Sequence, residues 1–526
     1  MRFSEDKIGQ VPFYVKRRAM RQHIVRCNAV SLLVLCVLLL GSQEKMEDQK
    51  HVVIVGGGLA GLSAAFAALQ KNAQVTLIEG ERAVGGNSAK ATSGINGCRT
   101  STQLALGVDD DTETFFTDTV KAGHDINNRE LVSLLVHDSP EAIERLKNVG
   151  VQLEDLVLLG GHSIKRTHRI KAKEGKAAPV GFTIIRTLFE HLKEFASSQS
   201  AHFAVRTSTT VHGLLVDKNG VVTGVRTKSA GAPDEEVISA DAVILATGGF
   251  SNDHTDHSLL KEFAKDKIEY PTTNGPFAVG SGVKMARAIG ARLVDMDKVQ
   301  LHPTGFVDPK KPGEKTKFLA AEALRGSGGI LLNEKGQRFA NELGARDYLT
   351  ERIEKFCKKD DSGGHVAFLV LNDEAADKFG RPAFGFYWNV KNFFTKVDNG
   401  EKLAEMIDVP PPRLSSTLSE YNEAAKGKQD SFGKSVFPTT FAWREPFYVA
   451  KITPVIHYTM GGIAIDNRTR VLRNDGSIIQ GLYAAGEVSG GVHGGNRLGG
   501  NSLLECAVFG NVAGLEASRK IYFSSV

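Results

Sequence analysis

The chain has 526 residues, more than one hydrophobic core usually serves, so at least two domains and room for a buried cofactor are expected. Its net charge of +5 is small for this length and comes partly from a basic N-terminus, which excludes the electrostatic footprint of a nucleic-acid-binding protein. The five cysteines form no CxxC pair, haem-attachment motif or iron–sulfur ligand run, so no metal is expected.

Residues 1–49 are predicted to be a signal or targeting segment. The basic stretch 16–26 precedes an apolar run at 29–40, which is the layout of a signal sequence. The run is about a dozen residues, shorter than the roughly 20 of a spanning helix, so no stable membrane span is expected, and an uncleaved anchor is the alternative. A start at Met20 would give an ordinary signal for the endoplasmic reticulum or secretory lumen, whereas the full Arg-rich leader suits a mitochondrial route.

A strand, a glycine turn, a helix and a second strand are predicted from residue 51 onward. Apolar runs at 52–55 and 75–78 give the strands, and 62–69 gives the helix. This order predicts a right-handed βαβ unit that begins a doubly wound parallel sheet.

The turn between them has the spacing of a dinucleotide-binding loop. Gly56 permits the tight turn, Gly58 lets the backbone approach a pyrophosphate, and Gly61 lets the helix lie close on the sheet. Ala60 is a further predicted contact at the helix N-terminus, which favours phosphate. Glu79 ends the second strand and is expected to accept a hydrogen bond from ribose hydroxyls. The alternative is a glycine turn that caps the helix and binds no ligand. Such a turn would not need the acidic side chain of Glu79.

Amphipathic helices are predicted between residues 112 and 150. One is expected to open with Ser139 as its cap and Pro140 at the first helical position, and to end near Gly150. Their expected role is packing.

A β-hairpin with its turn at 217–220 is predicted next, because an Asn-Gly pair separates two apolar runs. The apolar strand 242–245 then runs into Thr247 and Gly248. This strand is expected to return the chain to the nucleotide sheet.

An inserted domain is predicted at 298–450, where a lysine-rich loop at 309–317, interpreted as solvated, and a proline run at 410–412 change the texture of the sequence. Glycine turns resume afterwards. The nucleotide domain is therefore expected to comprise residues 50–297 and 451–526, with 298–450 as a capping, substrate-binding domain.

Two further glycine turns favour FAD over NAD. Gly86-Asn87-Ser88 opens an extended segment, and a strand at 482–485 runs into Gly486-Glu487 near the C-terminus. Such a distal turn approaches the ribityl chain and diphosphate in two-dinucleotide flavoproteins. The predicted fold class is α/β: a Rossmann-type two-dinucleotide FAD-binding domain with an inserted α+β capping domain.

Six separated motifs resemble the fumarate reductase and succinate dehydrogenase flavoprotein family, and within it the soluble fumarate reductases of yeast. The resemblance covers roughly residues 51–520 and rests on 85–96, 301–305, 321–326, 338–347, 457–462 and 493–501. It implies FAD contacts from Gly86, Asn87, Ser88, Ser93, Gly94, Thr247, Gly248, Glu487, Asn501, Ser502 and Leu503.

The resemblance also implies roles in reducing a C=C bond between two carboxylates, which takes a hydride, a proton and a firm grip on a dianion. Arg497 and His457 would hold one carboxylate and His302 the other. Arg346 would donate the proton and be resupplied through Glu322 and Arg325, which share one face if that segment is helical.

Structural alternatives exist for these residues. His302 outside its His-Pro-Thr-Gly setting would be an ordinary buried histidine. Arg346 could form an ion pair with Asp347 or Glu342 at the surface.

Two departures from the family pattern bear on function. No histidine lies between residues 80 and 100, where the family's covalent flavin link would fall near Asn87, so non-covalent FAD is expected. Ala321 stands where bacterial relatives often have a hydroxyl, which bears on the substrate.

The leading hypothesis is a fumarate reductase that takes electrons from a reduced flavin nucleotide or another small donor. The alternatives are a flavoenzyme that reduces another 2-enoate or oxidises a dicarboxylate or amino acid, and an electron-transfer subunit.

Overall fold

The computed structural model describes residues 49–171, 179–199, 202–360 and 363–519. The predicted targeting segment lies outside these ranges except for its last residue. No helix within them combines the length and the apolar character that crossing a membrane requires.

The predicted βαβ unit forms within a six-stranded sheet of order β18-β19-β10-β1-β2-β6. Val53 of β1 lies opposite Thr76 of β2 and Val243 of β10, and both pairings are parallel. Parallel sheets bury both faces, which explains the uninterrupted apolar runs. The strands are β1 His51–Val55, β2 Gln74–Ile78, β6 Phe203–Arg206, β10 Ala242–Leu245, β18 Arg470–Leu472 and β19 Ile478–Ala484.

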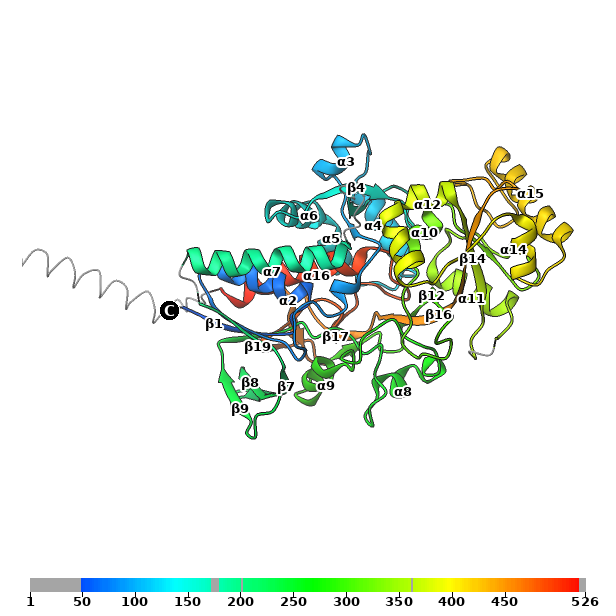
Figure 1. Cartoon of the computed structure of the whole chain (residues 1–526). Coiled ribbons are helices and arrows are strands. Elements are labelled where there is room, and N and C mark those ends of the chain that lie inside the picture. Colours follow the sequence, from blue (N-terminus) through cyan, green and yellow to red (C-terminus); the bar gives the residue numbers. More distant parts are fainter. Residues whose placement is uncertain (1–48, 172–178, 200–201, 361–362, 520–526) are drawn as a thin grey trace, which may run out of the picture. The chain divides into compact units, whose positions relative to one another are not determined.

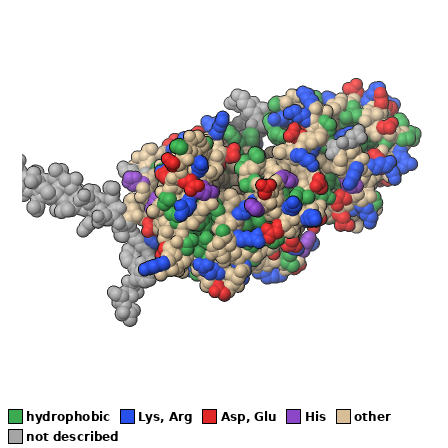
Figure 2. Space-filling view, turned by 90° about the horizontal axis from the view of Figure 1, so that it is seen from below, with side chains coloured by type: hydrophobic (Ala, Val, Ile, Leu, Met, Phe, Trp, Pro, Cys, Tyr) green, Lys and Arg blue, Asp and Glu red, His purple; other side chains and the backbone are tan. Residues whose placement is uncertain are grey.

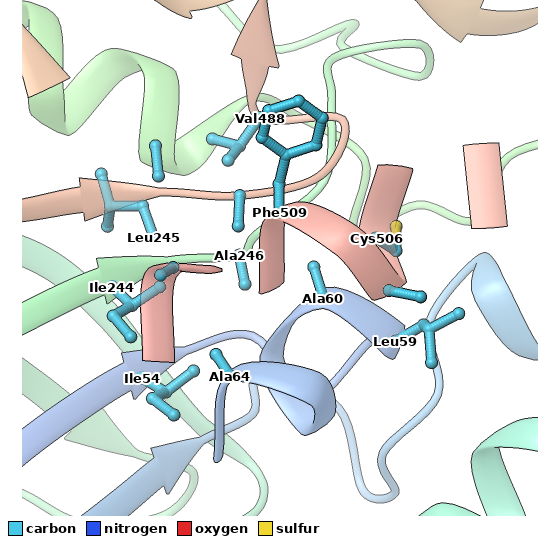
Figure 3. Packing of buried hydrophobic residues seen from close by; sticks show 14 of the residues in the cluster. Ile54, Leu59, Ala60, Ala64, Ile244, Leu245, Ala246, Val488, Cys506 and Phe509 are labelled. Carbon is cyan, nitrogen blue, oxygen red and sulfur yellow. The ribbon is translucent and has the colours of Figure 1, made fainter. Parts of the chain in front are cut away.

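One face of this sheet is covered by helices α2 Leu59–Gln70, α7 Val180–Ser198 and α16 Asn501–Ala517 (Figure 1). Small residues let α2 and α16 approach closely. A Cβ at Gly510 would lie 2.4 Å from the Ala60 carbonyl oxygen, and one at Gly514 would lie 2.2 Å from the Ala64 carbonyl oxygen. Figure 3 shows Ala60 on the side of α2 that faces α16. The C-terminal helix therefore belongs to the nucleotide-binding core.

The predicted hairpin is confirmed in a three-stranded sheet of β7 Thr209–Val216, β8 Val222–Ser229 and β9 Glu236–Ser239. Asp217 Oδ1 accepts hydrogen bonds from the backbone N–H groups of Asn219 at 2.8 Å and Val221 at 2.9 Å. In Figure 1 this sheet lies across the nucleotide sheet from α7.

The predicted helices between residues 112 and 150 are confirmed as α4 Thr112–Ala122, α5 Arg129–His137 and α6 Ser139–Asn148. The expected cap was wrong: α6 is preceded by Asp138 as N-cap, and its first residue is Ser139. Ser139 Oγ accepts a hydrogen bond from the Cys98 backbone N–H at 3.2 Å, so this hydroxyl binds a distant chain segment instead of capping its own helix.

Residues 298–450 contain a second, antiparallel sheet of order β12-β16-β14-β13, with β15 also paired to β16. The strand β16 runs through the predicted boundary at 450 and joins this sheet to the nucleotide-binding part of the chain. The strands are β12 Val299–Phe306, β13 Ile330–Leu332, β14 Ala367–Asn372, β15 Thr395–Val397 and β16 Phe447–Thr459.

Successive side chains of these strands point to opposite faces of the sheet and so contribute to two apolar cores. Leu369 and Leu371 of β14 belong to one apolar cluster, whereas Val370 belongs to another. Helices add further members to both clusters, so each face of the sheet is covered. They are α10 Glu322–Gly326, α11 Arg346–Phe356, α12 Asp373–Phe379, α13 Arg381–Gly385, the π-helix η3 Phe386–Val390, α14 Gly400–Met406 and α15 Pro411–Gly427.

Short elements connect these parts. They are α3 Ser101–Ala105, α8 Leu259–Phe263, α9 Ser281–Ala288, the 3-10 turns η1 Ser88–Lys90 and η2 Lys265–Lys267, and the strands β3 Ile95–Asn96, β4 Leu153–Val157, β5 Thr167–Ile170, β11 Leu293–Val294, β17 Gly462–Ala464 and β20 Ser489–Gly490. On the face in Figure 2, Lys and Arg lie among Asp and Glu without a large area of one sign.

Candidate active site

A cavity of about 1420 Å³ extends from the glycine loop of the nucleotide sheet to residues of the capping segment. Drug-sized ligands occupy about 300–1,000 Å³, so this space suits a dinucleotide together with a small substrate. It is lined by most of the predicted cofactor residues: Gly56, Gly58, Ala60, Glu79, Gly86, Asn87, Ser88, Ser93, Gly94, Thr247, Gly248, Glu487, Ser502 and Leu503.

The glycines of the first loop differ in what surrounds them. Gly56 has φ +110° and its Cβ would lie 2.3 Å from the Ala246 carbonyl oxygen, so only glycine fits. A Cβ on Gly58 would meet nothing closer than Ser88 Oγ at 3.5 Å, on the cavity side. Gly61 does not line the cavity; its Cβ would lie 1.9 Å from the Gly56 carbonyl oxygen, which fits its predicted packing role.

Glu79 fixes the loop from the next strand. Its carboxylate accepts hydrogen bonds from the backbone N–H groups of Gly57 at 2.7 Å and Glu81 at 2.9 Å. A carboxylate has about four lone-pair sites, so acceptor capacity remains for ribose hydroxyls.

The second glycine turn is held by side-chain amides. Asn87 donates to Asn274 Oδ1 and accepts from the Gly275 backbone N–H at 3.2 Å. Ser88 Oγ accepts from the Leu59 backbone N–H at 3.2 Å, which ties this turn to the N-terminus of α2. Both glycine turns thus face one space.

Two predicted cofactor residues at the C-terminal end behave differently. Asn501 does not line the cavity, because its side chain accepts from Asn96 Nδ2 at 2.6 Å and donates to Thr119 Oγ1 at 3.3 Å. Glu487 lines the cavity and accepts from the Thr459 backbone N–H at 3.0 Å. Burial raises the pKa of Glu487 to about 7.

A buried cluster of charged side chains lies where the cavity meets the capping segment. Arg346, the first residue of α11, donates from Nε and Nη2 to Glu322 Oε2 at 3.0 and 2.9 Å, and from Nη1 to Gln300 Oε1 at 2.9 Å. Glu322 Oε1 accepts from the Gly160 backbone N–H at 2.6 Å. Burial opposes ionisation of Glu322, but Arg346 and Arg325 outweigh it and lower the pKa of this carboxyl.

Arg325 lies beside this pair on α10, so the segment is helical, which the sequence had left open, and Glu322 and Arg325 are both buried. Arg325 Nη1 donates to the Glu342 carbonyl oxygen. Its Nε and Nη2 are buried with no hydrogen-bond partner among the described residues, so no hydrogen bond joins it to Glu322. Burial lowers the pKa of Arg325.

Two histidines pack edge to face at the same place, with 5.1 Å between the ring centroids of His302 and His457. The Thr304 backbone N–H lies 3.2 Å from His302 Nδ1, so neutral His302 carries its proton on Nε2. His302 Nε2 is buried and has no partner among the described residues. Burial, followed by the charge of Arg346, keeps the pKa of both imidazoles well below the usual value.

Arg497 completes the cluster from the C-terminal segment. Its guanidinium carbon lies 4.4 Å from the Tyr458 ring centroid, and Nη1 donates to the Leu498 carbonyl oxygen at 3.2 Å. Burial, followed by Arg346, lowers the pKa of Arg497 to about 10. Of the three arginines in this cluster, only Arg346 forms an ion pair among the described residues, with Glu322. Glu342 and Glu487 act on Arg325 and Arg497 without pairing with them, so the cluster keeps positive charge that no ion pair neutralises.

Comparison with known proteins agrees with this site. Residues 51–503 match the family described as FAD binding domain. The chain is 41% identical to the fumarate reductase of Schizosaccharomyces pombe over 475 residues, which is 90% of each chain. The chain belongs to the fumarate reductase and succinate dehydrogenase flavoprotein family. It therefore binds FAD on a Rossmann-type fold.

Other members of the family support the same assignment. Fumarate reductase 1 of Saccharomyces cerevisiae is 39% identical and is matched over 97% of its length by 88% of this chain. The solved open conformation of a flavocytochrome c3 fumarate reductase is 32% identical with a TM-score of 0.70, covering 91% of this chain and 80% of that one.

The structure excludes one alternative for Arg346. The surface ion pair is excluded, because Asp347 pairs with His124 at 2.7 Å and Glu342 pairs with Arg338 at 2.7 Å. Arg346 itself is buried against Glu322.

Sequence reasoning missed the residues that position this flavoprotein's cluster. Gln300 accepts from Arg346 and donates from Nε2 to the Arg497 carbonyl oxygen at 2.8 Å, so it connects two arginines. Thr273 Oγ1 lies 2.7 Å from His457 Nδ1. The one sequence signal for Gln300 was its position two residues before His302 on β12.

Proposed function

We propose that this chain is a fumarate reductase that converts fumarate to succinate. The observation that carries the proposal is the buried, positively charged cluster at one end of the FAD cavity, where Arg346, Arg497 and His457 line the cavity and His302 packs against His457. A small dianion would neutralise this excess charge where water is scarce and electrostatic interactions are strong.

FAD would be held by the glycine loop at Gly56 and Gly58, by Glu79, by the Asn87–Ser88 turn and by Ser502 and Leu503. Bound FAD supplies the hydride for the reduction. Non-covalent binding is expected, because the amide of Asn87 replaces the family's linking histidine.

The substrate carboxylates would be held at two places. Arg497 and His457 would bind one of them, with the guanidinium supplying two parallel donors. His302 would donate from Nε2 to the other, since that nitrogen has no hydrogen-bond partner within the part of the chain that the structure describes. This grip would align the C=C bond and stabilise charge that develops during hydride transfer.

Arg346 would donate the proton to the second carbon. Its Nε and Nη2 are fixed by Glu322 and its Nη1 by Gln300, so the guanidinium is pre-oriented. An arginine almost never stays deprotonated, so the proton has to be replaced at once. Glu322 would return it directly, and Arg325 would supply Glu322 after a small side-chain movement that makes the missing hydrogen bond.

The electron source and compartment complete the proposal. A reduced flavin nucleotide or another small donor would bring the electrons. The leader would direct the protein to the mitochondrion or to the endoplasmic reticulum and secretory lumen.

Anaerobic oxidation of reduced methyl viologen by the leaderless holoenzyme tests the proposed reaction. We expect turnover with fumarate, stoichiometric succinate, and far slower oxidation with acrylate or urocanate. Faster turnover with another 2-enoate would favour the alternative substrate class, to which Ala321 is relevant. No turnover with any acceptor, together with tightly bound partner proteins, would favour an electron-transfer subunit.

A further inference from the structure

The rim of the FAD cavity carries aromatic and basic side chains that the proposed chemistry does not use. Phe318 and Phe386 line the cavity and are 43% and 39% exposed, which is unusual for two phenylalanines in contact. Their ring centroids lie 6.1 Å apart. A flat aromatic molecule could stack on them.

Basic groups accompany these rings. Lys391 Nζ lies 4.7 Å from the Phe318 ring centroid and 5.6 Å from that of Phe386. No carboxylate among the described residues forms an ion pair with Lys391. Lys311 and Lys317 add positive charge, and Glu314 is the acidic residue on this part of the rim.

The lysine-rich loop at 309–317 was expected to be solvated, but its last lysine is buried. Lys317 is 7% exposed and donates to the Pro312 carbonyl oxygen. Burial lowers its pKa. The Lys317 backbone N–H donates to the Thr272 carbonyl oxygen at 2.8 Å, which fixes the loop beside the Asn274–Asn87 pair.

This rim therefore adjoins the turn that contacts FAD. On the other side of that turn, Lys90 Nζ lies 5.2 Å from the Phe277 ring centroid, and both residues line the cavity. The cavity is therefore lined by a second aromatic ring with a lysine over it. Stacking and charge neutralisation are the interactions that bind nucleotides without base-specific contacts.

We propose that this rim is the docking site of the electron donor, a reduced flavin nucleotide whose ring system stacks on Phe318 and Phe386 and whose phosphate binds Lys391 and Lys311. The inference rests on the proposed function and adds the donor's place. The reduced nucleotide gives up a hydride and a proton at the rim and leaves oxidised. By way of bound FAD, the same two electrons and two protons convert fumarate to succinate.

Lys391→Gln tests the site, with Lys396→Gln as matched control. Lys396 also lies over aromatic rings, at 5.3 Å from the Tyr448 centroid and 5.8 Å from that of Trp388. Neither of these rings lines the cavity, whereas Phe318 and Phe386, over which Lys391 lies, both do. The measured quantity is the rate with reduced FMN divided by the rate with reduced methyl viologen. We expect Lys391→Gln to lower this ratio by about threefold to fivefold, as for an exposed ion pair, and Lys396→Gln to leave it unchanged.

Phe318→Ala and a binding measurement provide independent checks. Loss of a stacking face should weaken binding of oxidised FMN to the holoenzyme, measured by equilibrium dialysis, by roughly tenfold. Riboflavin lacks the phosphate, so Lys391→Gln should weaken FMN binding but not riboflavin binding. Equal FMN binding and equal rate ratios in all variants would overturn the docking site while leaving the proposed function intact. Absence of viologen-driven fumarate reduction in the wild-type protein would instead overturn the proposed function.

Discussion

The glycine loop at 56–61 and the cluster around Arg346 form two ends of one cavity but are built differently. The loop works through its backbone, and its function depends on side chains being absent at Gly56 and Gly61. The cluster works through side chains that come from distant segments, namely Gln300, Glu322 and Arg346. A substitution in the loop should therefore disturb folding and FAD content, whereas one in the cluster should spare both and reduce turnover.

Arg346→Lys should give the largest effect. A lysine cannot reproduce the planar fork that Glu322 and Gln300 hold, so proton donation would fail. We expect kcat for fumarate to fall by about 10²–10⁴-fold with normal FAD content, measured by the viologen assay and flavin absorbance.

Arg352→Lys is the control, because Arg352 lies on the same helix and donates to the Phe339 carbonyl oxygen at 2.7 Å, away from the cluster. It should keep the wild-type kcat. Near-wild-type turnover in Arg346→Lys would exclude this residue as the proton donor.

Arg497→Gln should have the next largest effect. It removes a charge that contacts the cavity, so kcat/KM for fumarate should fall by about 10²-fold. In the proposed site Arg497 binds the substrate carboxylate rather than FAD, so flavin content should be unchanged. An unaltered kcat/KM would show that the carboxylate is bound elsewhere.

Gly61→Ala should act on the other end of the cavity. The added Cβ would overlap the Gly56 carbonyl oxygen and force α2 away from the sheet. We expect a loss of about 1–3 kcal/mol in the free energy of unfolding and reduced FAD content, measured by thermal unfolding and flavin absorbance. Gly313→Ala, where nothing lies within 4 Å of the new Cβ, should change neither.

The smallest effect expected near neutral pH is a change in the free energy of unfolding that comes from His168. His168 is buried, and its Nδ1 and Nε2 lie 2.9 Å from the Arg166 carbonyl oxygen and 2.7 Å from Thr100 Oγ1, which suits the neutral ring. Burial lowers the pKa of His168 from 6.5 to about 4. Between these values the unfolded chain binds the proton and the folded one does not, so stability is complete above pH 6.5 and is lost as pH falls towards 4.

Urea unfolding at pH 7.5 and pH 5 measures this effect. The wild-type protein should lose more free energy of unfolding between these pH values than His168→Gln does. Equal losses in the two proteins would mean that folding does not lower the pKa of His168.

Features that depend on neighbouring residues can be predicted from the amino-acid sequence alone. The βαβ unit and the turn at 217–220 follow from apolar periodicity and turn chemistry, and the structure confirms them. Whether Glu322 and Arg325 lie on a helix was left open by the sequence. The resemblance to a known family brought together His302, His457 and Arg497 as well, although chain order alone leaves them far apart.

The hydrogen-bond partner of each buried polar group depends on how distant segments pack in the folded chain. Ser139 was expected to cap its own helix, but its hydroxyl accepts from Cys98. Arg346 binds Glu322 and Gln300 rather than the adjacent Asp347. Hydrogen-bond partners are chosen by distance and burial after the segments pack, because a buried polar group must be satisfied by whatever lies beside it in space.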